Sequence, residues 1–273
     1  MARDKVLGAA TYTFLLSGDL PRAVELTAES GVRLIELTTA PPQVDRGELD
    51  PSLVRRVRAA FDATGTRPLS LNPTYLDVNL VSLNTGFRQE SLSQLLASLQ
   101  ACHDLEIPML VLFPGRRHVL APAPFEVSRR VLLDELDVLL THADRLGVVI
   151  GLENGPTNFL DRAAQVAAVC AEVDRPSLRI VYDVANAQMV EDPAAGVADV
   201  LPYLALVHVS DTSRVRWAHA RVGLGDVDFG AIAAALDSAP YDGPSLMEIV
   251  DLDDPLGALA SSVEALRRWG WRP

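Results

Sequence analysis

Residues 148–154 read Val-Val-Ile-Gly-Leu-Glu-Asn, a short apolar run that ends in a carboxylate. Three later runs repeat the pattern: Arg-Ile-Val-Tyr-Asp at 179–183, Leu-Ala-Leu-Val-His at 204–208 and Ser-Leu-Met-Glu-Ile at 245–249. Strands of a parallel sheet are covered on both faces and therefore read as nearly continuous apolar runs. Because an unpaired charge inside such a strand is costly, the four runs predict buried strands whose last side chains have a chemical task.

Similar runs recur along the whole chain and alternate with longer segments of helical period, which is the pattern of repeated βα units. The expected strands cover residues 6–11, 33–37, 68–72, 109–113, 148–153, 179–183, 204–209 and 245–249. The expected helices cover residues 21–30, 51–64, 88–105, 126–146, 162–172, 193–203, 229–238 and 254–269.

Eight such units with right-handed crossovers close into a barrel, whereas an open doubly wound sheet requires a reversal of strand order. No Gly-x-Gly-x-x-Gly follows the first strand, which disfavours a dinucleotide-binding sheet. In a barrel the carboxyl ends of all strands meet on one face, so the four unusual residues would become neighbours. We therefore predict an α/β protein, a (β/α)8 TIM barrel that forms a single domain over residues 1–273.

Composition narrows the function classes. The chain has 273 residues, of which 49% are hydrophobic, so it can bury a sizeable core. Its net charge of −12 disfavours a nucleic-acid partner. No run approaches the roughly 20 apolar residues of a membrane span, so we expect no membrane partner. Polar residues 11–13 interrupt the N-terminal apolar stretch, which argues against a secretory signal. Cys102 and Cys170 favour free thiols in a reducing cytoplasm over a disulfide.

Glu153, Asp183, His208 and Glu248 offer three carboxylates and one imidazole. This ligand set suits Mn²⁺, Co²⁺, Mg²⁺, Fe²⁺ or Zn²⁺, and the absence of a cysteine from it argues against a structural zinc site. The alternative is that each acid separately pairs with an arginine or caps a helix, which is less economical for four residues in register. We predict one bound divalent metal ion, whose identity stays open.

Several motifs together resemble the xylose isomerase-like sugar isomerase/epimerase family, above all its inosose isomerase and ketose 3-epimerase branch. The resemblance covers nearly the whole chain and is strongest over residues 148–249. The motifs are Glu-Asn at 153–154, Tyr-Asp-Val-Ala-Asn-Ala at 182–187, His-Val-Ser-Asp-Thr at 208–212, Gly-Leu-Gly-Asp-Val-Asp-Phe at 223–229 and Met-Glu-Ile at 247–249.

The resemblance implies a barrel with one metal bound by Glu153, Asp183, His208 and Glu248, acting on a polyhydroxylated carbonyl compound. Such a metal stabilises an enediolate, while Glu153 and Glu248 flank the substrate and transfer the proton. Return of the proton to the opposite face gives epimerisation, and return to the adjacent carbon gives isomerisation. Loss of a β-hydroxyl gives a lyase instead, of the 3-dehydroshikimate dehydratase or C-glycoside-cleaving kind, and this alternative stays open.

Candidate substrate contacts follow from position and resemblance. Many members of the resembling family have a histidine where this chain has Asn186, which disfavours a second metal; Asn186 is expected to bind a substrate hydroxyl or to cap a helix. Arg214 and Arg221 follow the seventh strand and are candidates to hold substrate oxygens, with solvated loop arginines as the alternative. Arg116 follows the fourth strand and could hold an anionic group.

Two further titratable residues and four aromatic residues complete the predicted site. Glu36, on the second strand, is expected to line the mouth or pair with an arginine, with a supporting role behind the ligands favoured. His219 is a candidate substrate contact. Aromatic residues that could shield a sugar, with core packing as the commoner explanation, are Tyr12, Phe14, Tyr75 and Phe113.

Other function classes fit the sequence less well. An abasic-site endonuclease of the same ancestry needs additional histidine ligands and a basic surface that the sequence does not show. A non-catalytic binding subunit is disfavoured by the complete set of four ligands. We therefore expect a cytoplasmic enzyme whose partner is a small sugar, inosose or keto-acid substrate, and assembly into a homo-oligomer stays open.

Overall fold

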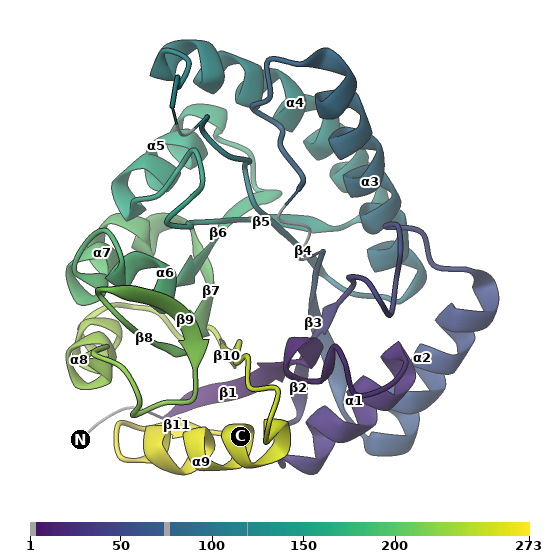
Figure 1. Cartoon of the computed structure of the whole chain (residues 1–273), viewed down its shortest axis with the longest axis vertical. Helices are drawn as coiled ribbons and strands as arrows, with labels where there is room; N and C mark the ends of the chain where they lie inside the picture. The colour runs from purple at the N-terminus through teal and green to yellow at the C-terminus, as the bar shows by residue number, and fades with distance from the viewer. Residues whose placement is uncertain (1–3, 74–76, 119) are drawn as a thin grey trace.

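The computed structural model describes residues 4–73, 77–118 and 120–273. Eight parallel strands follow one another around a closed ring (Figure 1): β1 (Lys5–Ala10), β2 (Leu34–Thr38), β3 (Arg67–Asn72), β4 (Met109–Leu112), β5 (Val149–Glu153), β6 (Leu178–Asp183), β7 (Leu204–Val209) and β10 (Ser245–Met247). Pairing of β10 with β1, which sets Leu7 opposite Ser245 and Ala9 opposite Met247, closes the sheet. The predicted (β/α)8 barrel is confirmed.

Helices cover the outside of this ring (Figure 1): α1 (Leu20–Glu29), α2 (Pro51–Thr64), α3 (Thr85–Asp104), α4 (Phe125–Leu146), α5 (Ala163–Val173), α7 (Pro193–Val200), α8 (Phe229–Ser238) and α9 (Pro255–Arg267). Local signals set their ends. Asp50 caps α2 by accepting the N–H groups of Ser52 and Leu53. Gly65 and Gly147 end α2 and α4 at φ values of 64° and 70°, a conformation that glycine adopts without steric cost.

The predicted helices 51–64 and 229–238 and the strand 204–209 match the structure, and the ends of the other predicted elements lie within three residues of the observed ones. The last predicted helical turn, residues 201–203, is the 3₁₀ helix η2 (Leu201–Tyr203). Short elements that the pattern did not predict are η1 (Thr11–Phe14), α6 (Val184–Gln188), β8 (Asp211–Ser213), β9 (Arg216–Ala220) and β11 (Trp271–Arg272). They contain two to five residues, too few for a periodic signal.

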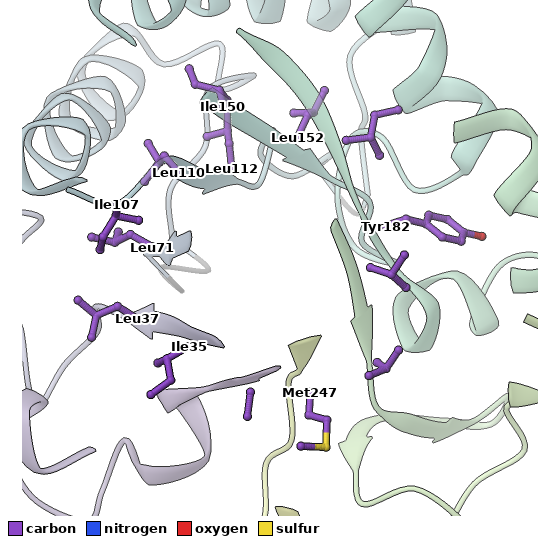
Figure 2. Packing of buried hydrophobic residues seen from close by; sticks show 14 of the residues in the cluster. Ile35, Leu37, Leu71, Ile107, Leu110, Leu112, Ile150, Leu152, Tyr182 and Met247 are labelled. Carbon is purple, nitrogen blue, oxygen red and sulfur yellow. The ribbon is translucent and has the colours of Figure 1, made fainter. Parts of the chain in front are cut away.

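The apolar core has an outer and an inner part. On the outside of the ring, side chains such as Leu37, Leu112 and Leu152 point away from the barrel axis toward the helices (Figure 2). Strand neighbours of such residues face inward, because successive side chains alternate. A separate buried cluster, here called the inner plug, consists of Val111, Val181, Leu206 and Leu246. Gly8 leaves room for it, since a Cβ there would lie 2.3 Å from Leu246 Cδ2.

Among the described residues, no helix combines the length and the apolar character needed to cross a bilayer. Cys102 on α3 and Cys170 on α5 are both free and buried. Burial raises the pKa of both thiols, that of Cys170 to about 12, so neither is a reactive thiolate near neutral pH.

Candidate metal centre

The four predicted ligands lie at the carboxyl ends of β5, β6, β7 and β10. Asp183, His208 and Glu248 each follow a residue of the inner plug by two positions, and Glu153 follows Gly151 in the same way. A period of two keeps such side chains on one face of a strand, so all four point into the barrel directly above the plug. The apolar runs thus carry four polar groups to the mouth of the barrel, where catalytic residues of this fold are found.

These residues form one compact cluster. Each of Glu153, Asp183, His208 and Glu248 offers one ligand atom, and these atoms all lie within 4.8 Å of one another. His208 Nδ1 lies 3.0 Å from Glu153 Oε1, 3.8 Å from Glu248 Oε2 and 3.9 Å from Asp183 Oδ2. Their side chains are almost completely shielded, with Glu248 the most exposed at 3%. We call these four residues the candidate metal centre.

Glu36 on β2 supports His208 from the other side of its ring. Its Oε2 lies 3.1 Å from His208 Nε2, and its carboxylate also accepts hydrogen bonds from Ser70 Oγ at 2.7 Å and Asn72 Nδ2 at 3.1 Å. A carboxylate behind a histidine sets which ring nitrogen carries the proton and turns the other nitrogen toward the site. The sequence analysis expected Glu36 to line the mouth or to pair with an arginine; in the described part of the chain its ion pair is with His208 and not with an arginine.

Ser70 and Asn72 on β3 are site residues that the sequence reading missed. Residues 67–72 read Arg-Pro-Leu-Ser-Leu-Asn, in which a polar side chain alternates with leucine. Leu71 is buried in the outer core, so the period of two places Ser70 and Asn72 on the inner face. This alternation of polar residues with leucine is visible in the sequence. Its role becomes clear only in the structure, where Ser70 and Asn72 both hydrogen-bond to the Glu36 carboxylate on β2.

Glu248 is held by residues from two other elements. Asn72 Nδ2 donates to Glu248 Oε1 at 3.3 Å, and His219 Nδ1 lies 3.2 Å from Glu248 Oε2. His219 is on β9, and the same nitrogen lies 3.1 Å from Ser210 Oγ and 3.9 Å from Asp183 Oδ2. The structure therefore brings the predicted His219 against the candidate metal centre.

Asn186 joins the site to the β8–β9 hairpin. Its backbone N–H donates to Asp183 Oδ1 at 2.6 Å, so Asp183 also caps α6. The Asn186 side chain donates to the carbonyl of Asn154 at 3.0 Å and accepts the indole N–H of Trp217 at 2.9 Å. Trp217 was not singled out from the sequence. Asn186 thus uses both ends of its amide within the protein.

The Gly-x-Gly motif at residues 223–225 packs against Asp211 at the base of the β8–β9 hairpin. Asp211 is 1% exposed, and its carboxylate accepts the N–H groups of Gly223 at 2.8 Å and Val227 at 3.2 Å. A Cβ at Gly225 would lie 2.4 Å from Asp211 Oδ1 and from the Thr212 carbonyl oxygen, so only glycine fits this close approach. Asp211 and the glycines therefore fix the hairpin that carries Trp217 and His219.

The electrostatics of the cluster are compatible with a bound cation. Burial raises the pKa of Glu153 to about 7 and that of Glu248 well above its usual range, although the His208 charge opposes both shifts. Burial also acts to lower the pKa of His208, but the Glu36 and Glu153 carboxylates outweigh it and raise that pKa. Glu153 Oε2 and Asp183 Oδ2 are buried without a hydrogen-bond partner among the described residues.

Within the described chain, no ion pair joins a lysine or arginine to these carboxylates. Two orphaned carboxylate oxygens beside an imidazole nitrogen therefore fit a divalent ion with oxygen and nitrogen ligands.

In the described part of the chain, the surroundings of the three predicted arginines lie away from the candidate metal centre. Arg214 is exposed near the tip of the β8–β9 hairpin and lines a surface cavity of about 340 Å³. Arg221 pairs with Asp251, its Nη2 lying 2.6 Å from Asp251 Oδ2. Arg116 is half-buried and lines a second surface cavity, of about 350 Å³, together with His118.

The predicted aromatic residues divide between core and mouth. Phe14 is 1% exposed and belongs to the outer core. Tyr12 is half-buried, and both burial and the charge of Glu248 raise the pKa of its hydroxyl. Phe113 is half-buried at the end of β4. Tyr75 lies outside the described residues.

Several solved structures share this architecture. The chain is similar to a D-tagatose 3-epimerase-like protein, with a TM-score of 0.82 and 19% identity over 96% of this chain and 98% of that one. It is also similar to a 3-keto-D-glucoside 4-epimerase from E. coli, with a TM-score of 0.80 and 23% identity over 97% of this chain and 100% of that one. At these identities the likeness establishes the fold alone.

Sequence relatives add to this likeness. A ketose 3-epimerase of Arthrobacter globiformis is 32% identical over 110 residues, which cover 39% of this chain and 36% of the relative. An uncharacterized protein of Methanocaldococcus jannaschii is 23% identical over 192 residues, which cover 66% of this chain and 64% of that protein. The chain thus spans less than two thirds of either relative. The family model described as xylose isomerase-like TIM barrel matches residues 24–269, so the chain belongs to this family.

Proposed function

We propose that the chain is a divalent-metal-dependent isomerase or epimerase of a sugar or keto-polyol, acting by proton transfer. The observation that carries the proposal is the candidate metal centre, in which two glutamates and an aspartate share a buried site with one histidine. Glu153, Asp183, His208 and Glu248 would hold a divalent ion there, and such an ion would act as a Lewis acid that makes the C–H bond next to a substrate carbonyl more acidic. Manganese is one candidate among Mn²⁺, Co²⁺, Mg²⁺, Fe²⁺ and Zn²⁺.

Glu153 and Glu248 are the proposed proton carriers. They come from β5 and the end of β10 and approach the same nitrogen of His208 from different strands, at 3.0 and 3.8 Å. One carboxylate removes the proton next to the carbonyl, and the other returns a proton from a different direction. His208, held by Glu36, positions Glu153, while Asn72 and His219 position Glu248.

The comparisons support the reaction class. The matched proteins include a ketose 3-epimerase, a 3-keto-D-glucoside 4-epimerase and a D-allulose 3-epimerase solved with D-allulose. All three names describe inversion at a carbon of a sugar that carries a keto group. We propose the same class of small-molecule substrate here, and a cytoplasmic location in keeping with the free thiols of Cys102 and Cys170.

A substrate panel tests the proposal. Purified protein supplied with Mn²⁺ or Co²⁺ is incubated with D-allulose, D-tagatose, an inosose and 3-dehydroshikimate, in H₂O and in D₂O. We expect conversion of a keto-sugar or inosose, with deuterium entering the carbon next to the carbonyl. Full activity without solvent exchange would contradict proton transfer, and consumption of 3-dehydroshikimate alone would indicate a lyase.

A further inference from the structure

We propose that Thr38 on β2 and Asn72 on β3 form a subsite for neutral hydroxyl groups, and that the substrate is therefore an uncharged keto-polyol and not a keto acid. We call these two residues the β2–β3 wall. The inference rests on the proposed function, because it names the substrate class of the same site.

The wall lies beside the candidate metal centre. Thr38 and Asn72 are opposite one another in the β2–β3 register. Thr38 follows Glu36 by two residues, so its side chain projects to the same inner face and one step nearer the mouth. Asn72 Nδ2 lies 3.1 Å from Glu36 Oε1 and 3.3 Å from Glu248 Oε1, which places the amide within one hydrogen bond of a proposed proton carrier.

Two polar atoms of the wall have no partner. Thr38 Oγ1 and Asn72 Oδ1 are buried without a hydrogen bond to any described residue, and both side chains are 0% exposed. Buried polar atoms of native proteins are nearly always paired, so these two unpaired atoms, which lie beside the candidate metal centre, point to a bound molecule that supplies the partner.

Electrostatic repulsion sets the orientation of the Asn72 side-chain amide. Its oxygen would be repelled by the carboxylates of Glu36 and Glu248, so Nδ2 faces them and Oδ1 remains free as an acceptor. The Thr38 hydroxyl both donates and accepts. An acceptor beside a hydroxyl matches the alcohol groups of a polyol, which also donate and accept.

The charges around the wall disfavour an anionic substituent. Its charged neighbours are the carboxylates of Glu36 and Glu248, and no hydrogen bond or ion pair of the described residues brings a lysine or arginine to it. Arg221 is engaged with Asp251 and Arg214 is exposed near the hairpin tip. A carboxylate bound at the wall would face the like charge of Glu36 and Glu248, which a divalent ion at the candidate metal centre would offset only in part, whereas a hydroxyl would not.

The chain offers a matched pair of variants, Thr38→Val and Thr39→Val. Thr39 Oγ1 is also buried and unpaired in the described structure, but Thr39 lies one residue beyond the end of β2, where continued alternation would turn its side chain away from that of Thr38. Each change replaces a hydroxyl with a methyl group of nearly the same shape. With the neutral ketose or inosose that the wild type converts, Thr38→Val should raise KM by about 10-fold, the effect of one lost hydrogen bond. Thr39→Val should change KM by less than about 2-fold.

A thermal melt and a deoxy-substrate series complete the experiment. Neither variant should lower Tm, because neither hydroxyl makes a bond in the free protein. The wild type should discriminate against one mono-deoxy form of its substrate, and Thr38→Val should lose that discrimination. Equal KM effects of the two variants, or a lowered Tm for Thr38→Val alone, would overturn the subsite. Wild-type turnover of 3-dehydroshikimate without any neutral ketose or inosose would instead overturn the proposed function, and the substrate class with it.

Discussion

The candidate metal centre and the β2–β3 wall are built by the same rule but from different residues. Both place polar side chains two positions beyond an inward-facing residue, at the mouth of one barrel. The candidate metal centre gathers three carboxylates that could hold a cation, whereas the wall presents an uncharged hydroxyl and an amide. One end of the barrel thus separates the residues that we propose to activate a substrate from those that we propose to recognise it.

The largest effect is expected at the proposed proton carriers. Glu248→Gln keeps the size of the side chain and an oxygen ligand but accepts no proton at neutral pH, so kcat should fall by about 10³-fold. Glu153→Gln should behave likewise. Steady-state kinetics combined with metal analysis of each variant will check this, with the exposed Glu264→Gln on α9 as the control. Near wild-type kcat in a metal-loaded Glu248→Gln protein would show that this side of the mouth does not carry the proton.

A smaller effect is expected behind the metal centre. Glu36→Gln keeps the size of the side chain but replaces one acceptor oxygen with an NH2 donor and removes the negative charge beside His208 Nε2, so the affinity for a divalent ion should drop by about 10- to 100-fold. Competition with a chelator measures this Kd. Glu90→Gln, which alters an exposed ion pair with Arg46, should leave the affinity unchanged. An unaltered Kd for the divalent ion in Glu36→Gln would show that Glu36 does not support metal binding.

Metal binding should also stabilise the fold, because the ion offsets the mutual repulsion of Glu153, Asp183 and Glu248. At a free metal concentration 100 times Kd, binding adds about 2.7 kcal/mol, which corresponds to a rise in Tm of several degrees. Scanning fluorimetry before and after chelation tests this, and metal analysis should give about one ion per chain. Two or three ions per chain would contradict a mononuclear centre.

The smallest effects are expected for the arginines that the sequence proposed as substrate contacts. Arg214 is exposed, and Arg221 is bonded to Asp251, so alanine at either position should lower the catalytic efficiency, kcat/KM, by less than about 3-fold. Loss of the partly exposed Arg221 pair should cost less than about 1 kcal/mol of stability. A loss of about 100-fold in catalytic efficiency for either variant would show that an arginine contacts the substrate. The contrast between a charged candidate metal centre and an otherwise neutral substrate-binding wall would then no longer hold.

Much of the site was predictable because its signals are local. Glu153, Asp183 and His208 each end an apolar run, and a charged group in that position is informative without any knowledge of neighbours. Glu36 stood out for the same reason. By contrast, Ser70 and Asn72 are ordinary polar residues until the β2–β3 register sets them against Glu36.

The β8–β9 hairpin shows why other contacts were not predictable. Its strands span three and five residues, too short for a periodic pattern. Trp217 meets Asn186 across 31 positions of the chain, and Arg221 meets Asp251 across 30. Such contacts depend on how loops pack over the mouth, so the sequence could nominate Arg221 for the substrate while the folded chain paired it with Asp251.

By itself the sequence predicted the barrel and singled out the four residues of the candidate metal centre, because hydrophobic period and buried charge are properties of single segments. Only the tertiary structure decided that Glu36 supports His208, that Asn72 joins Glu36 to Glu248, and that Thr38 keeps an unpaired hydroxyl beside them. The physical reason is that hydrogen bonds act over about 3 Å between specific atoms, and the closure of the sheet alone brings those atoms together.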